Sequence, residues 1–385
     1  MQHNFPISFI AGILLLWGCT DVERVESLID DFRDTHIEDT REEVFDISFR
    51  PRLGNQIVLN GEMEDSVLKR KLVGQLEKAG FSVLDSIEML PRDVPATWGL
   101  VRLSVANLRA SPSFRAELVT QAVMGTPVRV LKEKGGWVYI QTPDRYLSWC
   151  GKSALSFESD EEIEKWRQHD HVMFTSPFGF MIDTLSDQNV CDLVSGSILE
   201  AEKRAGEELF AKTPDGRTGR IKRSDVVPFD PDHVASEVDT SLIEEEARRL
   251  MGVPYLWGGT SAKGMDCSGF TKTVYRMNGL LLARDASLQV RHGEEVPADS
   301  GWSGFEKGDL LFFVPRRGSE RISHVGIYLS GGEYIHAAGR VKVNSLDSTS
   351  TKYNRHRDET LSEVRRIRGN EGVPGITPLV EHPWY

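Results

Sequence analysis

The spacing of hydrophobic residues divides the chain into segments with different periods. Residues 21–43 and 64–80 carry apolar side chains three or four positions apart, which predicts two amphipathic helices. The second helix is expected to end at Gly80, because glycine readily adopts the left-handed conformation found after a helix C-terminus. We therefore expect a helical N-terminal region over residues 19–95, and no chemistry is evident in it.

From Trp98 onward the hydrophobic period changes to two, which predicts strands. Alternating segments at 100–105, 126–131 and 137–140 are separated by turns that contain Gly, Pro and Asn. Short strands joined by such turns are typical of a small β-barrel. A weaker copy of the same pattern follows over residues 196–221.

Four short sequences in the first of these segments, NLRASP, TPVRVL, GGWVYIQT and YLSW, resemble bacterial SH3-like domains. The resemblance implies one SH3-like domain at residues 96–157, and the weaker copy implies a second at 158–232. Domains of this kind usually recognise ligands or pack against a neighbouring domain.

The beginning of the chain resembles a targeting segment. Ile7 to Trp17 is a run of 11 mostly apolar residues, shorter than the roughly 20 that span a bilayer and typical of a secretory signal. Leu16-Trp17-Gly18-Cys19 resembles a bacterial lipobox, which implies that residues 1–18 are removed and that Cys19 is lipidated. Such an anchor would hold the protein on the extracytoplasmic side of a bacterial membrane. The alternatives are an ordinary signal peptide and a buried helix that begins at residue 1.

Composition narrows the possible classes of protein. The chain has 385 residues, of which 39% are hydrophobic and 27% charged, which excludes wholesale disorder and favours two or three domains. Its net charge of −12 gives no basic footprint for nucleic acid, so we expect no nucleic-acid partner. Cys150 and Cys191 either pair in an oxidising compartment or remain two buried thiols. No sequence motif predicts a metal or a cofactor.

The last part of the chain contains a cysteine in a setting that favours chemistry. Asp266-Cys267-Ser268-Gly269-Phe270 leads into apolar residues at helical spacing, and this helix is expected to end at Gly279. Cys267 is therefore predicted at a helix N-terminus. Free N–H groups and the helix dipole favour a thiolate there, and the thiolate is the nucleophilic form.

Two histidines are predicted to lie near each other on a hairpin. The strands 323–329 and 333–336 flank a tight turn at Ser330-Gly331-Gly332. The turn brings His336 back near His324, either directly opposite or diagonally across, depending on the register. One histidine can then act as the base and the second can fix its orientation, as in a catalytic triad.

The motifs DCSGF, GDLLFF and HVGIY, with 57 positions from Cys267 to His324 and 12 more to His336, resemble the NlpC-type family of bacterial cell-wall cysteine peptidases. The resemblance implies an α+β protein with a papain-like domain at residues 237–385. It implies Cys267 as the nucleophile, His324 as the general base and acid, and His336 as the orienting residue. It also places Tyr255 at the edge of the active site, beside the oxyanion, and it implies neither a cofactor nor a metal.

Two SH3-like domains before such a peptidase domain resemble the subgroup that cleaves γ-D-glutamyl-L-diamino acid bonds in murein peptides with a free N-terminal L-Ala. The resemblance implies that Asp285 holds the free amine, and that an acidic residue and a tyrosine of the first SH3-like domain close the pocket. Glu117 and Tyr146 are the candidates for these two residues. The predicted substrate-binding residues are Tyr255, Trp257, Asp266, Ser268, Arg284, Asp285, Glu117 and Tyr146.

Two other functions remain open at this point. A hydrolase that remodels intact peptidoglycan would share the chemistry but would have an open pocket. A wall-binding adaptor would use the SH3-like domains for recognition and would carry a vestigial cysteine site. Activity on acylated peptides would indicate the hydrolase, and binding to sacculi without turnover would indicate the adaptor.

Overall fold

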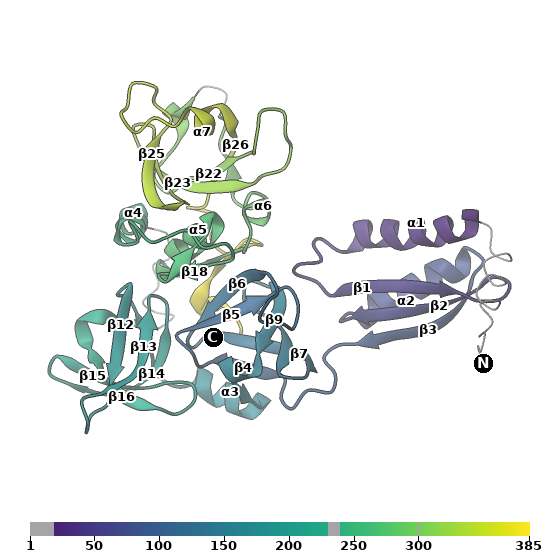
Figure 1. Ribbon diagram of the computed structural model, residues 1–385, viewed down its shortest axis with the longest axis horizontal. Helices are drawn as coiled ribbons and strands as arrows, with labels where there is room; N and C mark the ends of the chain where they lie inside the picture. The colour runs from purple at the N-terminus through teal and green to yellow at the C-terminus, as the bar shows by residue number, and fades with distance from the viewer. Residues whose placement is uncertain (1–18, 230–238, 299–300) are drawn as a thin grey trace, which may run out of the picture. The chain divides into compact units, whose positions relative to one another are not determined.

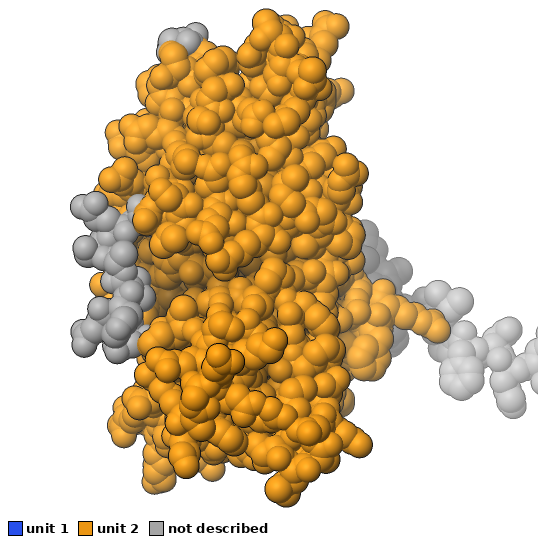
Figure 2. Space-filling view, turned by 90° about the vertical axis from the view of Figure 1, so that its left-hand side faces the viewer, with its two compact units in different colours: residues 1–94 blue, residues 95–385 orange. Residues whose placement is uncertain are grey.

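The structure is a computed structural model that describes residues 19–229, 239–298 and 301–385. The predicted signal segment at residues 1–18 lies outside the described residues, as does the side chain of Cys19. The chain forms two compact units, which divide between Val94 and Pro95. In the space-filling view the described atoms of the second unit form one continuous body (Figure 2).

The first unit contains a three-stranded sheet with two helices. Its elements are α1 (Cys19–His36), β1 (Phe45–Pro51), β2 (Gln56–Met63), α2 (Ser66–Lys78) and β3 (Ser82–Met89). β1 and β2 run antiparallel, whereas β2 and β3 run parallel and are connected through α2 (Figure 1). The side chain of Asp65 caps α2 by accepting hydrogen bonds from the backbone N–H groups of Val67 and Leu68.

Both predicted helices of this unit are confirmed, but the description of residues 19–95 as helical is wrong for the three strands. Ile57 and Leu59 of β2 are fully buried against apolar residues of both helices. These two positions show the period of two that marks a half-buried strand. The alternation is hidden in the sequence because Val58, which lies between them, is also apolar.

The second unit begins with two seven-stranded antiparallel sheets. The first contains β4 (Trp98–Val101), β5 (Val105–Arg109), β6 (Leu118–Val123), β7 (Pro127–Lys134), β8 (Trp137–Gln141), β9 (Leu147–Gly151) and β10 (Leu155–Glu158). The second contains β11 (His171–Phe174), β12 (Phe178–Ile182), β13 (Asn189–Val194), β14 (Ile198–Ala205), β15 (Glu208–Lys212), β16 (Thr218–Lys222) and β17 (Val226–Phe229). The helix α3 (Asp160–Arg167) lies between them in the chain.

The two sheets have the same strand order. The first is β10-β4-β7-β8-β9-β5-β6 and the second is β17-β11-β14-β15-β16-β12-β13. In each, a 3₁₀ turn precedes the last strand, at Lys152–Ala154 and at Arg223–Asp225. The predicted second copy of the barrel is therefore confirmed by its topology.

The C-terminal part of the second unit packs helices against a six-stranded sheet. Its helices are α4 (Thr240–Arg249), α5 (Cys267–Met277), α6 (Ala286–Gln289) and α7 (Arg355–Thr360). The sheet has the order β21-β26-β22-β23-β24-β25. Its strands are β21 (Glu294–Glu295), β22 (Leu310–Phe313), β23 (His324–Ser330), β24 (Glu333–Ala338), β25 (Arg340–Ser345) and β26 (Leu361–Arg366). Short pairs are formed by β18 (Thr260–Ser261) with β19 (Gly264–Met265) and by β20 (Leu280–Leu282) with β27 (Ile376–Pro378).

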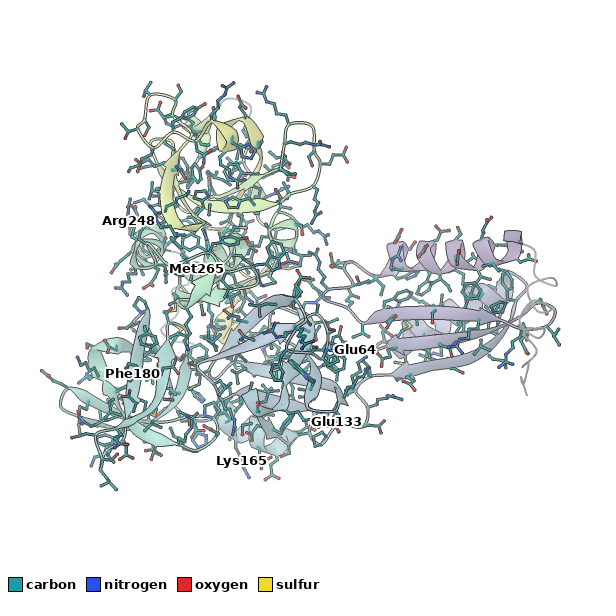
Figure 3. The ribbon with its side chains drawn as sticks, in the orientation of Figure 1. Glu64, Glu133, Lys165, Phe180, Arg248 and Met265 are labelled. Atoms are coloured by element: carbon teal, nitrogen blue, oxygen red, sulfur yellow. The ribbon has the colours of Figure 1, made fainter. Side chains whose placement is uncertain are left out.

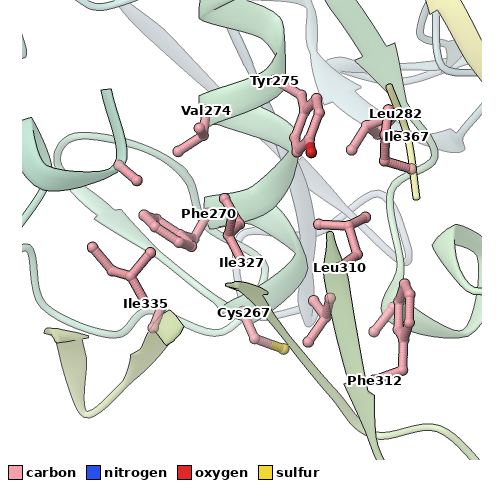
Figure 4. Close-up of a cluster of buried hydrophobic side chains, with 14 of the residues drawn as sticks. Cys267, Phe270, Val274, Tyr275, Leu282, Leu310, Phe312, Ile327, Ile335 and Ile367 are labelled. Atoms are coloured by element: carbon pink, nitrogen blue, oxygen red, sulfur yellow. The ribbon is translucent and has the colours of Figure 1, made fainter. Parts of the chain in front are cut away.

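The helix α5 forms the centre of this domain. Its apolar face carries Phe270 and Val274, which are fully buried against Leu310, Ile327 and other residues of the sheet (Figure 4). Met265, which is labelled in Figure 3, lies two residues before the helix and is also buried. This packing confirms the expected α+β fold and holds Cys267, the first residue of α5, against the sheet.

The first barrel docks on this domain through its edge strand β6 (Figure 1). Gln121 of β6 accepts hydrogen bonds from the backbone N–H of Thr260 at 3.0 Å and from the hydroxyl of Ser261 at 3.1 Å. Gly258 has a φ of +76°, and a Cβ there would lie 2.2 Å from the carbonyl oxygen of Leu118. Only glycine therefore allows β6 to approach the loop this closely.

Cys150 and Cys191 are free thiols in this structure, so the alternative in which they pair is not observed. Burial raises the pKa of Cys150 to about 12 and that of Cys191 to about 11. Within the described ranges, no helix combines the length and the apolar character needed to cross a bilayer.

Candidate active site

Cys267 occupies the N-terminus of α5, as predicted, and it is 7% exposed. The preceding residue, Asp266, caps the helix by accepting a hydrogen bond from the backbone N–H of Gly269 at 2.7 Å. A Cβ on Gly269 would lie 2.0 Å from the carbonyl oxygen of Gly259, which explains the glycine in the DCSGF motif. The local sequence thus fixes the position of the thiol.

The surroundings of Cys267 favour the neutral thiol over the thiolate. Burial and the nearby Asp266 carboxylate raise its pKa to about 11, although backbone hydrogen bonds from Val325 and Ser268 act in the opposite direction. The thiolate-favouring effect expected from the helix N-terminus is therefore outweighed by desolvation. Attack on a substrate consequently requires a base that accepts the proton of Cys267.

His324 and His336 form the predicted pair, and the structure selects the diagonal arrangement. Ile327 pairs with Ile335 across the hairpin, which places His336 beside Gly326 rather than opposite His324. The Nε2 atom of His324 lies 2.7 Å from the Nδ1 atom of His336. Both rings are buried, and burial lowers the pKa of each below the ordinary value for histidine, which favours the neutral form.

The hydrogen bonds beyond His336 determine which nitrogen of His324 can accept a proton. The side-chain N–H of Asn344 donates to the carbonyl oxygen of Lys352, so its Oδ1 faces His336 at 2.9 Å. An amide oxygen only accepts, and so Nε2 of His336 must carry a proton. Nδ1 of His336 then accepts from Nε2 of His324. Nδ1 of His324 is left as the basic atom available to Cys267.

Tyr255 is half-buried and packs against the apolar cluster that contains Cys267. Burial and the proximity of Cys267 raise the pKa of its hydroxyl, which therefore remains a hydrogen-bond donor. Its position agrees with the expected place at the edge of the site. Together with the backbone N–H of Cys267, it is a candidate donor to a developing oxyanion.

Residues of the first barrel meet the peptidase domain at two predicted positions. The hydroxyl of Tyr146 donates to the carboxylate of Asp285 at 3.2 Å. The indole N–H of Trp257 donates to the carboxylate of Glu117 at 2.7 Å. Tyr146 is buried, whereas Glu117 and Trp257 are exposed. The structure thus brings two carboxylates and a hydroxyl to the junction between the domains.

Arg284 is buried between the start of α5 and the strand β6 of the first barrel. It is 1% exposed, and its guanidinium donates to Asp266 at 2.6 and 3.2 Å, to Ser268 at 3.0 Å and to Thr120 of β6 at 2.9 Å. The expectation that Arg284 binds substrate stays a prediction, and in this structure its guanidinium is bonded within the protein. With Asp266 and Ser268, which are also buried, it positions the start of α5 and the edge of the barrel.

Two residues near His324 and His336 were not predicted from the sequence. Asn344 lies on β25 and contacts His336. Arg357 on α7 lies over the ring of Phe313, with its guanidinium carbon 5.3 Å from the ring centroid. Neither residue belongs to a short sequence motif. Asn344 reaches the site because β25 pairs with β24, and Arg357 reaches it because α7 lies close to β22. Among the described residues, no group of three or more His, Cys, Asp or Glu side chains could hold a metal ion.

Comparisons with known families agree with this geometry. Residues 252–360 match the NlpC/P60 family, and residues 108–155 match the bacterial dipeptidyl-peptidase SH3 domain. The first match contains Cys267, His324 and His336, and the second contains the part of the first barrel that carries Tyr146 and Glu117.

Curated relatives extend over most of the second unit. The chain is similar to dipeptidyl-peptidase 6 of Lysinibacillus sphaericus, with 29% identity over 69% of this chain and 97% of the relative. It is also similar to γ-D-glutamyl-L-lysine dipeptidyl-peptidase of Bacillus subtilis, with 32% identity over 64% of this chain and 80% of the relative. A solved NlpC/P60 protein from Bacillus cereus has the same fold, with a TM-score of 0.62 and 22% identity over 70% of this chain and 99% of that one.

Proposed function

The chain belongs to the NlpC/P60 family of cysteine peptidases, and on that premise we propose that it hydrolyses the γ-D-glutamyl-L-diamino acid bond of murein peptides with a free N-terminal L-Ala. The observation that carries this substrate is the contact between Tyr146 and Asp285 at the junction of barrel and peptidase domain. The names of the two similar dipeptidyl-peptidases support the same substrate class.

The reaction begins with the transfer of the Cys267 proton to Nδ1 of His324. The sulfur attacks the γ-carbonyl carbon of D-Glu, and the oxyanion accepts hydrogen bonds from the backbone N–H of Cys267 and the hydroxyl of Tyr255. As the C–N bond breaks, the imidazolium of His324 protonates the leaving amine of the diamino acid. Water, deprotonated by His324, then cleaves the thioester and releases L-Ala-D-Glu with the free thiol.

The free amine is recognised by charge. An ammonium group at the domain junction would form charge-assisted hydrogen bonds with the carboxylates of Asp285 and Glu117. The hydroxyl of Tyr146 holds Asp285 in place, and the indole N–H of Trp257 holds Glu117. An N-acyl group would remove that charge and would clash with the barrel. The protein would therefore recycle released wall peptides and leave intact wall, in which L-Ala is acylated, uncleaved.

We also propose an anchor at Cys19, which would hold the enzyme on the extracytoplasmic side of a bacterial membrane. Its support is the apolar run Ile7 to Trp17, followed by the lipobox-like Leu16-Trp17-Gly18-Cys19. Mass spectrometry of the protein from membranes of the producing cell is expected to find a lipidated Cys19 at the new N-terminus. An unmodified residue there would contradict the anchor.

A paired digestion tests the proposed substrate. Protein that begins after residue 19 is incubated with L-Ala-γ-D-Glu-diaminopimelate and with its N-acetyl derivative, and products are identified by mass spectrometry. We expect cleavage of the free-amine peptide alone and no product from Cys267→Ala. Equal cleavage of both peptides would indicate a wall-remodelling hydrolase. Binding to sacculi without cleavage of either peptide would indicate an adaptor.

A further inference from the structure

A positive charge lies beside the catalytic histidine without a carboxylate to neutralise it. Arg357 is half-buried on α7. Among the residues that the structure describes, its guanidinium forms no ion pair and no hydrogen bond, and its contact is the face of Phe313. The charged or polar groups that act on it are Tyr334, Cys267 and Tyr255.

The acidic residues next to Arg357 in the sequence have other partners. Asp358 accepts a hydrogen bond from the hydroxyl of Tyr353 at 2.9 Å, and Glu359 accepts one from Arg355 at 2.7 Å. Partial burial of an arginine without an anion is costly, since the guanidinium cannot lose its proton. Stacking on an aromatic ring compensates only in part and leaves the N–H groups at the edge of the guanidinium for a ligand.

The position of Arg357 indicates which part of the substrate it meets. Phe313 pairs with His324 across β22 and β23, and the two rings are 5.9 Å apart. His324 must protonate the leaving nitrogen, so the leaving group lies on the His324 side of Cys267. The carboxylates of Asp285 and Glu117 belong to the other part of the site, where the first barrel meets the loop before α5.

We propose that Arg357 binds a carboxylate of the leaving diamino acid and so selects substrates that carry this negative charge on the far side of the scissile bond. This inference rests on the proposed function and extends it to the leaving group. The substrate then has an ammonium group at one end, which faces the carboxylates of Asp285 and Glu117. It has a carboxylate at the other end, which faces the guanidinium of Arg357. Bidentate binding by a planar guanidinium makes the residue specific for arginine.

Two sources of such a carboxylate exist in the substrate class. Every diamino acid at the C-terminus of a tripeptide carries an α-carboxylate, next to the leaving nitrogen. Diaminopimelate carries a second carboxylate at the end of its side chain, whereas lysine does not. A guanidinium close to His324 and Cys267 is best placed for the α-carboxylate, which is adjacent to the bond that breaks.

A substrate–variant cycle tests the proposal. We would measure kcat/KM of the wild-type protein, Arg357→Gln and Arg357→Lys with L-Ala-γ-D-Glu-diaminopimelate and with its α-carboxamide, and repeat both with lysine as the diamino acid. Arg355→Gln is the matched control, because Arg355 lies on the same helix, is exposed and is paired with Glu359. Equilibrium binding of the same peptides to Cys267→Ala, with and without Arg357→Gln, provides a readout that does not need turnover.

We expect Arg357→Gln to lose about tenfold to a hundredfold in kcat/KM with the free carboxylate, mainly through KM, and to lose little with the carboxamide. Arg357→Lys should recover part of the loss, and Arg355→Gln should match the wild type. A loss with diaminopimelate but not with lysine would assign the side-chain carboxylate instead. Equal losses on acid and amide with both the diaminopimelate and the lysine peptides would overturn the proposal and indicate a role in stabilising the transition-state charge.

The two proposals fail in different ways. If the wild-type protein cleaves free-amine peptides but Arg357→Gln behaves like the wild type, only the inference about Arg357 is overturned. If the wild type neither cleaves nor binds any of the four peptides, the proposed function fails and the inference fails with it.

Discussion

The carboxamide of Asn344 fixes the proton positions of His336 through a hydrogen bond of 2.9 Å, and through His336 it fixes those of His324. The direction of these hydrogen bonds is set by the backbone carbonyl of Lys352. A carbonyl oxygen can only accept, so the side-chain N–H of Asn344 must point toward it. The basic atom of His324 is thus determined by Asn344 of β25, which acts through His336. Asn344 is therefore a positioning residue for His324, the proposed base.

We expect Asn344→Ala to lower kcat by about tenfold to a hundredfold and to change KM little, because the loss of one oriented hydrogen bond to a buried ring costs about 1–3 kcal/mol. Steady-state kinetics on the tripeptide measure this. Asn344→Gln retains the amide but displaces it, and should fall between the wild type and the alanine variant. A variant that loses kcat and melting temperature in parallel would indicate a merely structural role.

The protonation state of the resting site gives a second prediction. The pKa of Cys267 is raised to about 11, so the thiolate fraction should grow as the pH rises toward that value. The pKa of His324 lies below its ordinary value of 6.5, so kcat/KM should fall only when the solution becomes more acidic than that. A neutral thiol and a neutral imidazole therefore coexist over the intervening range of pH.

The rate of alkylation of Cys267 by iodoacetamide, followed by peptide mass spectrometry as a function of pH, tests this state. We expect the rate to keep rising above pH 9 or so, and His324→Gln to leave the shape of the profile nearly unchanged. A plateau that begins near pH 5 and disappears in His324→Gln would show a thiolate–imidazolium pair in the resting protein.

The positions of the candidate site residues could be predicted where they depend on residues close by in the sequence. Cys267 at a helix start and His324 with His336 on one hairpin follow from local period and turn residues, and the structure places them as expected. Asn344 and Arg357 could not be found in this way. They lie on β25 and α7, and only the tertiary fold places these elements next to the two histidines. The burial of Arg284 was also hidden, since it depends on contacts with a strand 164 residues earlier.

The junction between barrel and peptidase domain gives a third prediction. Asp285→Asn should lower kcat/KM for the free-amine tripeptide by about tenfold to a hundredfold, because the charge-assisted bond to the ammonium is weakened. Tyr146→Phe removes the hydroxyl that contacts Asp285 and should have a smaller effect in the same direction. Both variants should discriminate less strongly between the free-amine and N-acetyl peptides. Unchanged discrimination in Asp285→Asn would show that the ammonium binds elsewhere.

A buried ion pair between Lys272 of α5 and Asp144 of the first barrel gives a prediction about stability. The two side chains are 11% and 3% exposed, so each depends on the other for its charge. Lys272→Met leaves the Asp144 carboxylate buried without its cationic partner, and we expect it to destabilise the second unit by about 3–5 kcal/mol.

The double variant Lys272→Met/Asp144→Leu separates the charge effect from the loss of packing. It removes both charges and should recover most of the lost stability, since replacing a buried pair by apolar side chains is often neutral. Thermal unfolding of the wild type, the single variant and the double variant measures this recovery. The double variant should also keep the preference for free-amine peptides if apolar contact alone holds the barrel on α5. Recovered stability with a lost preference would show that the ion pair also sets the position of the barrel over the amine site.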